Sequence, residues 1–90
     1  MITRYRVSAL TEHDIASLLR LAACLGRHRI EIESFSLINP PGSTIYEHEL
    51  IVRAQAERVR RAVKQIGAFV GVVSITCRVV ESDVSREAGG

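Results

Sequence analysis

Three titratable residues, Glu12, His13 and Asp14, stand side by side in the stretch ALTEHDIASLL. Two carboxylates that flank an imidazole are suited to acid–base catalysis or to metal binding. A helix start explains the same residues, because Thr11 followed three positions later by Asp14 forms a capping box with aspartate in the usual glutamate position. Both carboxylates then lie near the positive end of the helix dipole. We therefore predict that the triplet begins a helix and is not catalytic.

Other residues suited to chemistry are few. His48 falls on the core-facing side of an alternating stretch, which favours a core or interface histidine over a metal ligand. Cys24 and Cys77 lack the spacing of a metal site, and their apolar surroundings predict two reduced core thiols, with a disulfide between them left open. The sequence thus predicts no catalytic residue and no metal ligand, and we expect that the chain is not an enzyme.

Segments with two different hydrophobic periods follow one another along the chain. Alternating residues indicate strands over 3–10, 30–38, 44–54 and 72–80, and apolar residues at three- and four-residue steps indicate helices over 15–25 and 55–67. Gly26 is expected to end the first helix, since glycine tolerates the left-handed C-terminal conformation. The apolar residues of 30–38 change phase between Ile32 and Phe35, which predicts a bulge near Glu33–Ser34.

The order of these elements predicts an α+β fold. With right-handed crossovers it gives a ferredoxin-like βαββαβ plait, in which a four-stranded antiparallel sheet carries two helices on one face. A chain of 90 residues is long enough for one domain, which we place at 1–80. The polar, glycine-ended stretch 81–90 is predicted to be a disordered tail.

Composition and charge argue against several classes of protein. The formal net charge of +2 is too small to argue for nucleic acid, and no apolar run is long enough to span a bilayer. The N-terminus lacks the apolar core and cleavage site of a signal peptide. We therefore expect a cytoplasmic protein with neither nucleic acid nor membrane as its partner.

Two features of the sequence bear on nucleic-acid binding. An RNA-recognition module needs stacking aromatics on its open sheet face, where the third strand instead offers Glu47 and Glu49. The second helix carries a run of cations, which most often forms a solvated face. That run leaves open one alternative, a small anion- or nucleic-acid-binding plait that uses Arg58, Arg60, Arg61 and Lys64.

A family resemblance rests on three stretches. The run YRVSALTEHDIASLLRLAACLGRHRIEIESFSL has a strand that ends in a short polar loop, a helix that begins at an acidic turn, and the residues IES before an apolar one. The stretches YEHELIVRA and FVGVVSITCRV agree with the third and fourth strands of the same family. Together they resemble the ACT domain, most closely that of acetolactate synthase regulatory subunits, and the length is similar to the short form of that subunit.

The resemblance implies a regulatory rather than a chemical role. The chain would form a homodimer through its sheet, and it would bind and activate a large catalytic subunit in branched-chain amino-acid biosynthesis. This chain would hold no cofactor, because thiamine diphosphate, FAD and magnesium belong to the catalytic partner. A branched-chain amino acid, where it binds, would lie between the first loop of one protomer and the second strand of the other. By this resemblance the effector-binding residues are Thr11, Glu12, His13, Asp14, Ile15, Ala16, Glu31, Ile32 and Glu33.

Three of these positions depart from the pattern of the family. His13 and Glu31 stand where asparagine is usual, and Ala16 stands where the family has the glycine that lets the backbone close on the effector carboxylate. We therefore expect effector binding to be weak or lost. The resemblance also leaves open a free-standing ACT domain that senses an amino acid and regulates another enzyme.

Overall fold

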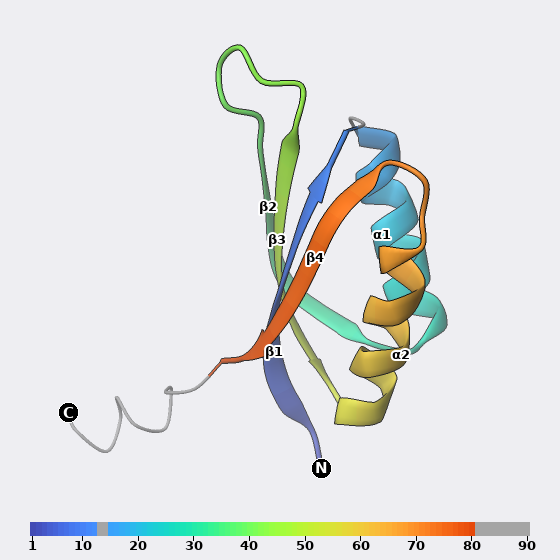
Figure 1. Cartoon of the computed structure of the whole chain (residues 1–90). Coiled ribbons are helices and arrows are strands. Elements are labelled where there is room, and N and C mark those ends of the chain that lie inside the picture. Colours follow the sequence, from blue (N-terminus) through green and yellow to red (C-terminus); the bar gives the residue numbers. More distant parts are fainter. Residues whose placement is uncertain (13–14, 81–90) are drawn as a thin grey trace, which may run out of the picture.

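The computed structural model describes residues 1–12 and 15–80. Within them the elements are β1 (Thr3–Thr11), α1 (Ile15–Arg27), β2 (Glu31–Ile38), β3 (Tyr46–Ala54), α2 (Ala56–Gly67) and β4 (Val72–Val79). The strands form one antiparallel sheet in the order β2-β3-β1-β4, and both helices lie on one face of it (Figure 1). The predicted α+β ferredoxin-like plait is confirmed. The predicted tail, 81–90, lies outside the described residues.

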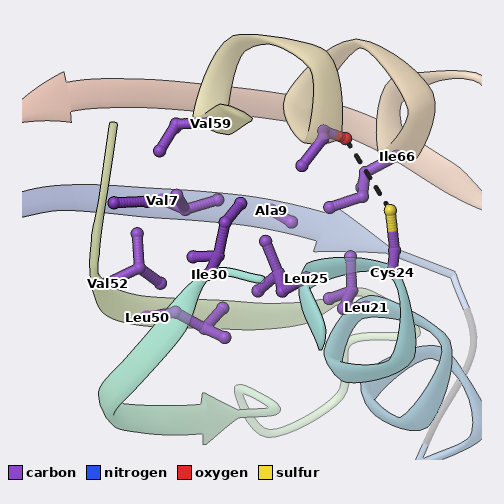
Figure 2. Packing of buried hydrophobic residues seen from close by; sticks show 12 residues of the cluster. Val7, Ala9, Leu21, Cys24, Leu25, Ile30, Leu50, Val52, Val59 and Ile66 are labelled. Carbon is purple, nitrogen blue, oxygen red and sulfur yellow. Dashed lines mark hydrogen bonds between the residues drawn. The ribbon is translucent and has the colours of Figure 1, made fainter. Parts of the chain in front are cut away.

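Buried aliphatic side chains hold the helices on the sheet. Val7 and Ala9 of β1 and Leu50 and Val52 of β3 face the helices, and each is at most 1% exposed. Their helix partners are Leu21, Cys24 and Leu25 of α1 and Val59, Ala62 and Ile66 of α2 (Figure 2). This single apolar layer explains why the two alternating central strands and the two amphipathic helices fold together.

The two cysteines have different surroundings, and both are free thiols. Cys24 is buried between the helices, where its Sγ lies 4.0 Å from the Ala62 carbonyl oxygen as a weak donor (Figure 2). Burial raises the pKa of the Cys24 thiol, so this group stays protonated. The prediction of a core thiol is confirmed for Cys24 and wrong for Cys77, which is exposed because β4 is an edge strand.

The first helix ends one residue later than Gly26 and closes differently from the prediction. The amide of Arg29 donates to the Gly26 carbonyl and the amide of Ile30 to the Leu25 carbonyl, each at 3.0 Å. These two bonds form a Schellman motif. Its left-handed residue is Arg29, with φ 59°. The buried side chains of Leu25 and Ile30 form the accompanying hydrophobic contact, and this places the left-handed position at Arg29 instead of Gly26.

The bulge predicted in the second strand is confirmed. The pairing of β2 with β3 shifts between Ile32, which lies opposite Val52, and Ser34, which lies opposite Ile51. The shift returns Phe35 and Leu37 to the helix-facing side, opposite Leu50 and His48. The third strand begins at Tyr46, two residues later than the predicted start at residue 44. The residues before it belong to the loop after β2, where Asn39 Nδ2 donates to the Ser43 and Ile45 carbonyls at 3.0 Å.

Candidate functional site

The predicted effector residues fall into two groups at opposite ends of the sheet. Thr11 ends β1 and lies opposite Tyr46, whereas Glu31 begins β2 in the row of Arg53 and Arg4. Thr11 is seven residues along β1 from Arg4. At about 3.3 Å per residue, the two groups are about 23 Å apart in one chain. A single protomer therefore does not bring the predicted site together.

The loop group begins with a buried threonine. Thr11 is 0% exposed, and its Oγ1 lies 3.0 Å from His48 Nε2, within hydrogen-bond distance. The amide of Glu12 donates to the Gly71 carbonyl at 2.8 Å, which joins the loop to the start of β4. α1 begins at Ile15, and Ala16 follows as an exposed residue. His13 and Asp14, and with them the predicted capping box, lie outside the described residues.

The side chain of His48 contacts the buried threonine at the start of this loop. Its ring is 1% exposed on the helix-facing side of β3, where the alternation had predicted a core histidine. Its Nδ1 is buried and has no hydrogen-bond partner among the described residues. Burial lowers the pKa of His48 below its ordinary value, because the charged imidazolium loses its hydration. The ring is therefore neutral at pH 7, and among the described residues Thr11 is its hydrogen-bond partner.

We expect acid to destabilise the protein through His48. Since its pKa is lower in the folded chain than in the unfolded chain, the unfolded state takes up the proton first. The stability that the neutral ring contributes is present above the unfolded pKa and is lost as pH falls towards the folded value. Urea unfolding from about pH 7 to about pH 5 should show a steeper loss of unfolding free energy in the wild type than in His48→Gln, by at most about 1.4 kcal/mol per pH unit. Equal pH dependence in the two proteins would contradict this role of His48.

The strand group consists of Glu31, Ile32 and Glu33. Glu33 sits in the bulge, and its carboxylate oxygens lie 3.1 Å from Arg4 Nε and 3.4 Å from Arg53 Nε. These ion pairs hold Glu33 against the open face of the sheet. Glu31 is exposed at the beginning of the strand, and Ile32 is 36% exposed on the helix-facing side. Of the three, Glu31 and Ile32 have exposed side chains that could contact another molecule at the sheet edge.

The β2 edge leaves apolar side chains uncovered. Phe35 shares a row with Leu50 and Val7, and it is 52% exposed whereas the other two are 1% exposed. The helices thus cover the centre of the sheet but not its β2 border. Leu19, on α1, is also 65% exposed. Because β2 is one of the two edge strands of the described sheet, its outer backbone groups have no neighbouring strand either. An edge with this composition favours pairing with another strand.

The open face of the sheet lacks the features of an RNA-stacking platform. Among the described strands, the aromatic residues Tyr5, Phe35 and Tyr46 all point to the helix side, in the rows of Val52, Leu50 and Thr11. Arg6 on the open face is 3.7 Å from a carboxylate oxygen of Glu49, its open-face neighbour across the sheet. The face therefore offers paired charges rather than stacked rings.

No metal site and no membrane span were found in the part of the chain that the structure describes. No group of three or more histidine, cysteine, aspartate or glutamate residues within 1–12 and 15–80 could hold a metal ion. Over the same residues no helix is long and apolar enough to cross a membrane.

Comparisons with known proteins found similar structures but no match by sequence. No family profile matches the chain, and no curated protein matches its sequence. Among solved structures, homoserine dehydrogenase from Thiobacillus denitrificans is similar with a TM-score of 0.75 and 15% identity, over 91% of this chain and 18% of that one. The ACT domain from GTP pyrophosphokinase of Chlorobium tepidum is similar with a TM-score of 0.72 and 10% identity, over 87% and 100%.

A third similar structure is the acetolactate synthase small subunit from Thermotoga maritima. Its TM-score is 0.70 at 17% identity, over 91% of this chain and 50% of that one. At such identities the likeness shows the fold alone, and that fold is the one that ACT domains have. The chain spans less than a fifth of the dehydrogenase and half of the small subunit, so it corresponds to a part of each of those proteins.

Proposed function

We propose that this chain is a regulatory subunit without catalysis of its own, which dimerises through β2 and binds and activates the large catalytic subunit of acetolactate synthase. Thiamine diphosphate, FAD and magnesium would belong to that partner. The observation that carries the proposal is the separation of the predicted effector residues, which one chain holds at opposite ends of its sheet. A site of that composition needs a second copy.

Antiparallel pairing of two β2 edges supplies that second copy. In such a pair the start of one β2 lies beside the end of the other. The end of β2 is Ile38, in the row of Glu47 and Leu10, next to Thr11. Glu31 of the second copy would therefore lie near the β1–α1 loop of the first. The same pairing would bury Phe35 and satisfy the outer backbone groups of β2.

We expect the wild type to bind valine, leucine and isoleucine weakly or not at all. The methyl group of Ala16 crowds the approach of the effector carboxylate to the first turn of α1, and Glu31 of the second copy adds a negative charge beside it. Each effect is expected to cost about 1–3 kcal/mol, by analogy with overpacking and with an unpaired interfacial charge. Calorimetry should detect binding only in the double variant Ala16→Gly, Glu31→Asn. Tight binding of a branched-chain amino acid by the wild type would overturn this expectation.

The identity of the partner is tested by co-purification. A tagged copy of the chain, expressed in its own organism, should retain a thiamine-diphosphate-dependent acetolactate synthase, identified by mass spectrometry. A control with Phe35→Asp asks whether the dimer is needed for that capture. Recovery of a different amino-acid-regulated enzyme would favour the alternative, a free-standing ACT domain that senses an amino acid. That alternative has its own support, because a domain from a pyrophosphokinase has the same fold.

A further inference from the structure

Three arginines from separate segments meet at one hollow of about 360 Å³ at the end of the sheet opposite the β1–α1 loop. Arg29 comes from the turn between α1 and β2, Arg53 from the end of β3, and Arg58 from the first turn of α2. Glu31 is the acidic residue among the described residues of the wall. The hollow is separate from the loop half of the effector site, and the alternative based on the second helix included Arg58 but neither Arg29 nor Arg53.

Among the described residues, the wall of the hollow carries more positive than negative charge. Arg53 Nε lies 3.4 Å from Glu33 Oε2, and Arg4 shares the same carboxylate at 3.1 Å. The charged residues that line the hollow are three arginines and Glu31, a net charge of +2. Like charges gathered at one place repel each other, and a bound dianion would remove that repulsion.

Contacts within the protein position Arg53 and Arg58 but leave most of their N–H donors available to a ligand. Arg58 Nη1 donates to the His28 carbonyl at 3.4 Å, and Arg53 contacts Glu33 through Nε. Each of these contacts uses one of the five N–H donors that a guanidinium carries. Arg53 and Arg58 are exposed residues, so solvent reaches them. Planar forks of this kind are suited to the paired oxygens of a phosphate group.

Arg29 occupies a backbone position that a smaller residue would fill more easily. It is the left-handed residue of the Schellman motif, with φ 59°, where glycine is usual. Its side chain is therefore not explained by the helix end. The wall also includes Gln55, the N-cap of α2, whose side chain makes no capping hydrogen bond. The positive end of the α2 dipole adds to the potential of the arginines, which carry the site.

We propose that this hollow binds a small ligand bearing a dianionic phosphate group, through Arg29, Arg53 and Arg58. Its volume, about 360 Å³, is near the lower limit for small-molecule pockets and suits a phosphate monoester rather than a nucleic-acid strand. The three arginines all come from one chain, so the site needs no residue of a second copy or of a catalytic partner. A regulatory chain would thereby have a second ligand site, which shares only Glu31 with the residues predicted to bind an amino acid.

The test is an NMR titration of the full chain with inorganic phosphate and with phenyl phosphate, each compared with sodium chloride at matched ionic strength. Saturable shifts are expected around the amides of Arg29, Gln55 and Arg58. Arg29→Gly removes the charge while it places the residue that the left-handed turn prefers, and Arg58→Gln removes the second charge. The double variant should weaken phosphate binding by about tenfold or more, as expected for the loss of charge-assisted hydrogen bonds.

A matched control lies on the same helix. Arg60 is exposed and paired with Glu57 at 2.5 Å, and it is not part of the hollow. Arg60→Gln should bind phosphate as the wild type does, and urea unfolding should show Arg29→Gly to be no less stable than the wild type. The proposal is overturned if the wild type shows no saturable shift beyond that in chloride, or if Arg60→Gln loses as much binding as the double variant. Preference for an oligonucleotide over phenyl phosphate would also overturn it.

Discussion

Phe35→Asp is expected to convert the proposed dimer into a monomer. The side chain of Phe35 is 52% exposed on the helix-facing side of the β2 border, so a monomer gains little from it. Burying a phenylalanine stabilises by about 1.5–3 kcal/mol, and a twofold interface buries the residue of each copy. Loss of both, with two aspartates in their place, should raise the dissociation constant by about 100-fold or more. Light scattering and sedimentation would measure the change.

A charge on the other side of the same strand provides the control for this variant. Ser36 is the next residue, is exposed, and points to the open face opposite Glu49. Ser36→Asp should leave the dimer largely intact, and circular dichroism should show that both variants are folded. A wild type that is monomeric at tens of micromolar, the order at which such interfaces hold, would contradict pairing through β2. So would a Phe35→Asp protein that remains dimeric.

Leu50→Ala is expected to remove a large part of the stability of the fold. Leu50 is 1% exposed on a central strand, between Phe35 and Val7 in the same row of the sheet and beneath the helices. Truncating such a leucine leaves a cavity and costs about 2–5 kcal/mol. A domain of this length has a total stability of about 5–13 kcal/mol, so the loss should be large in urea unfolding.

The control for the core variant is the exposed leucine of α1. Leu19 is 65% exposed, and Leu19→Ala should change the unfolding free energy by less than about 0.5 kcal/mol. Both substitutions are best measured in the Phe35→Asp background, because the proposed dimer would add a concentration-dependent term to stability. A cost below about 1 kcal/mol for Leu50→Ala would show that the core differs from the one in Figure 2.

The fold could be predicted because each element has a clear period. The phase change between Ile32 and Phe35 even predicted the bulge, since apolar residues on both sides of it must face one core. The end of α1 could not be predicted from Gly26 alone. There the burial of both Leu25 and Ile30 sets the turn, and this tertiary contact overrides the local preference of glycine.

Some features depend on the order and register of the strands, which local sequence patterns do not give. Cys77 alternates with other apolar residues, which is typical of a buried position. It is exposed because β4 has a neighbouring strand on one side only, and alternation does not show which strand is at the edge. The pairing of Thr11 with His48 depends on the register of β1 against β3, which no local pattern gives. The arginine hollow is likewise built from segments far apart in the sequence. Nothing local in the sequence marks Arg29, because its left-handed φ of 59° is seen only in the structure.

The measurement that tests the central claim most directly is the activity of the acetolactate synthase catalytic subunit from the same organism, titrated with this chain. We predict that acetolactate formation rises severalfold, saturates at equimolar subunits, and falls back when Phe35→Asp replaces the wild type. The chain alone should form no acetolactate. Unchanged activity together with no co-migration of the two proteins in gel filtration would contradict the account.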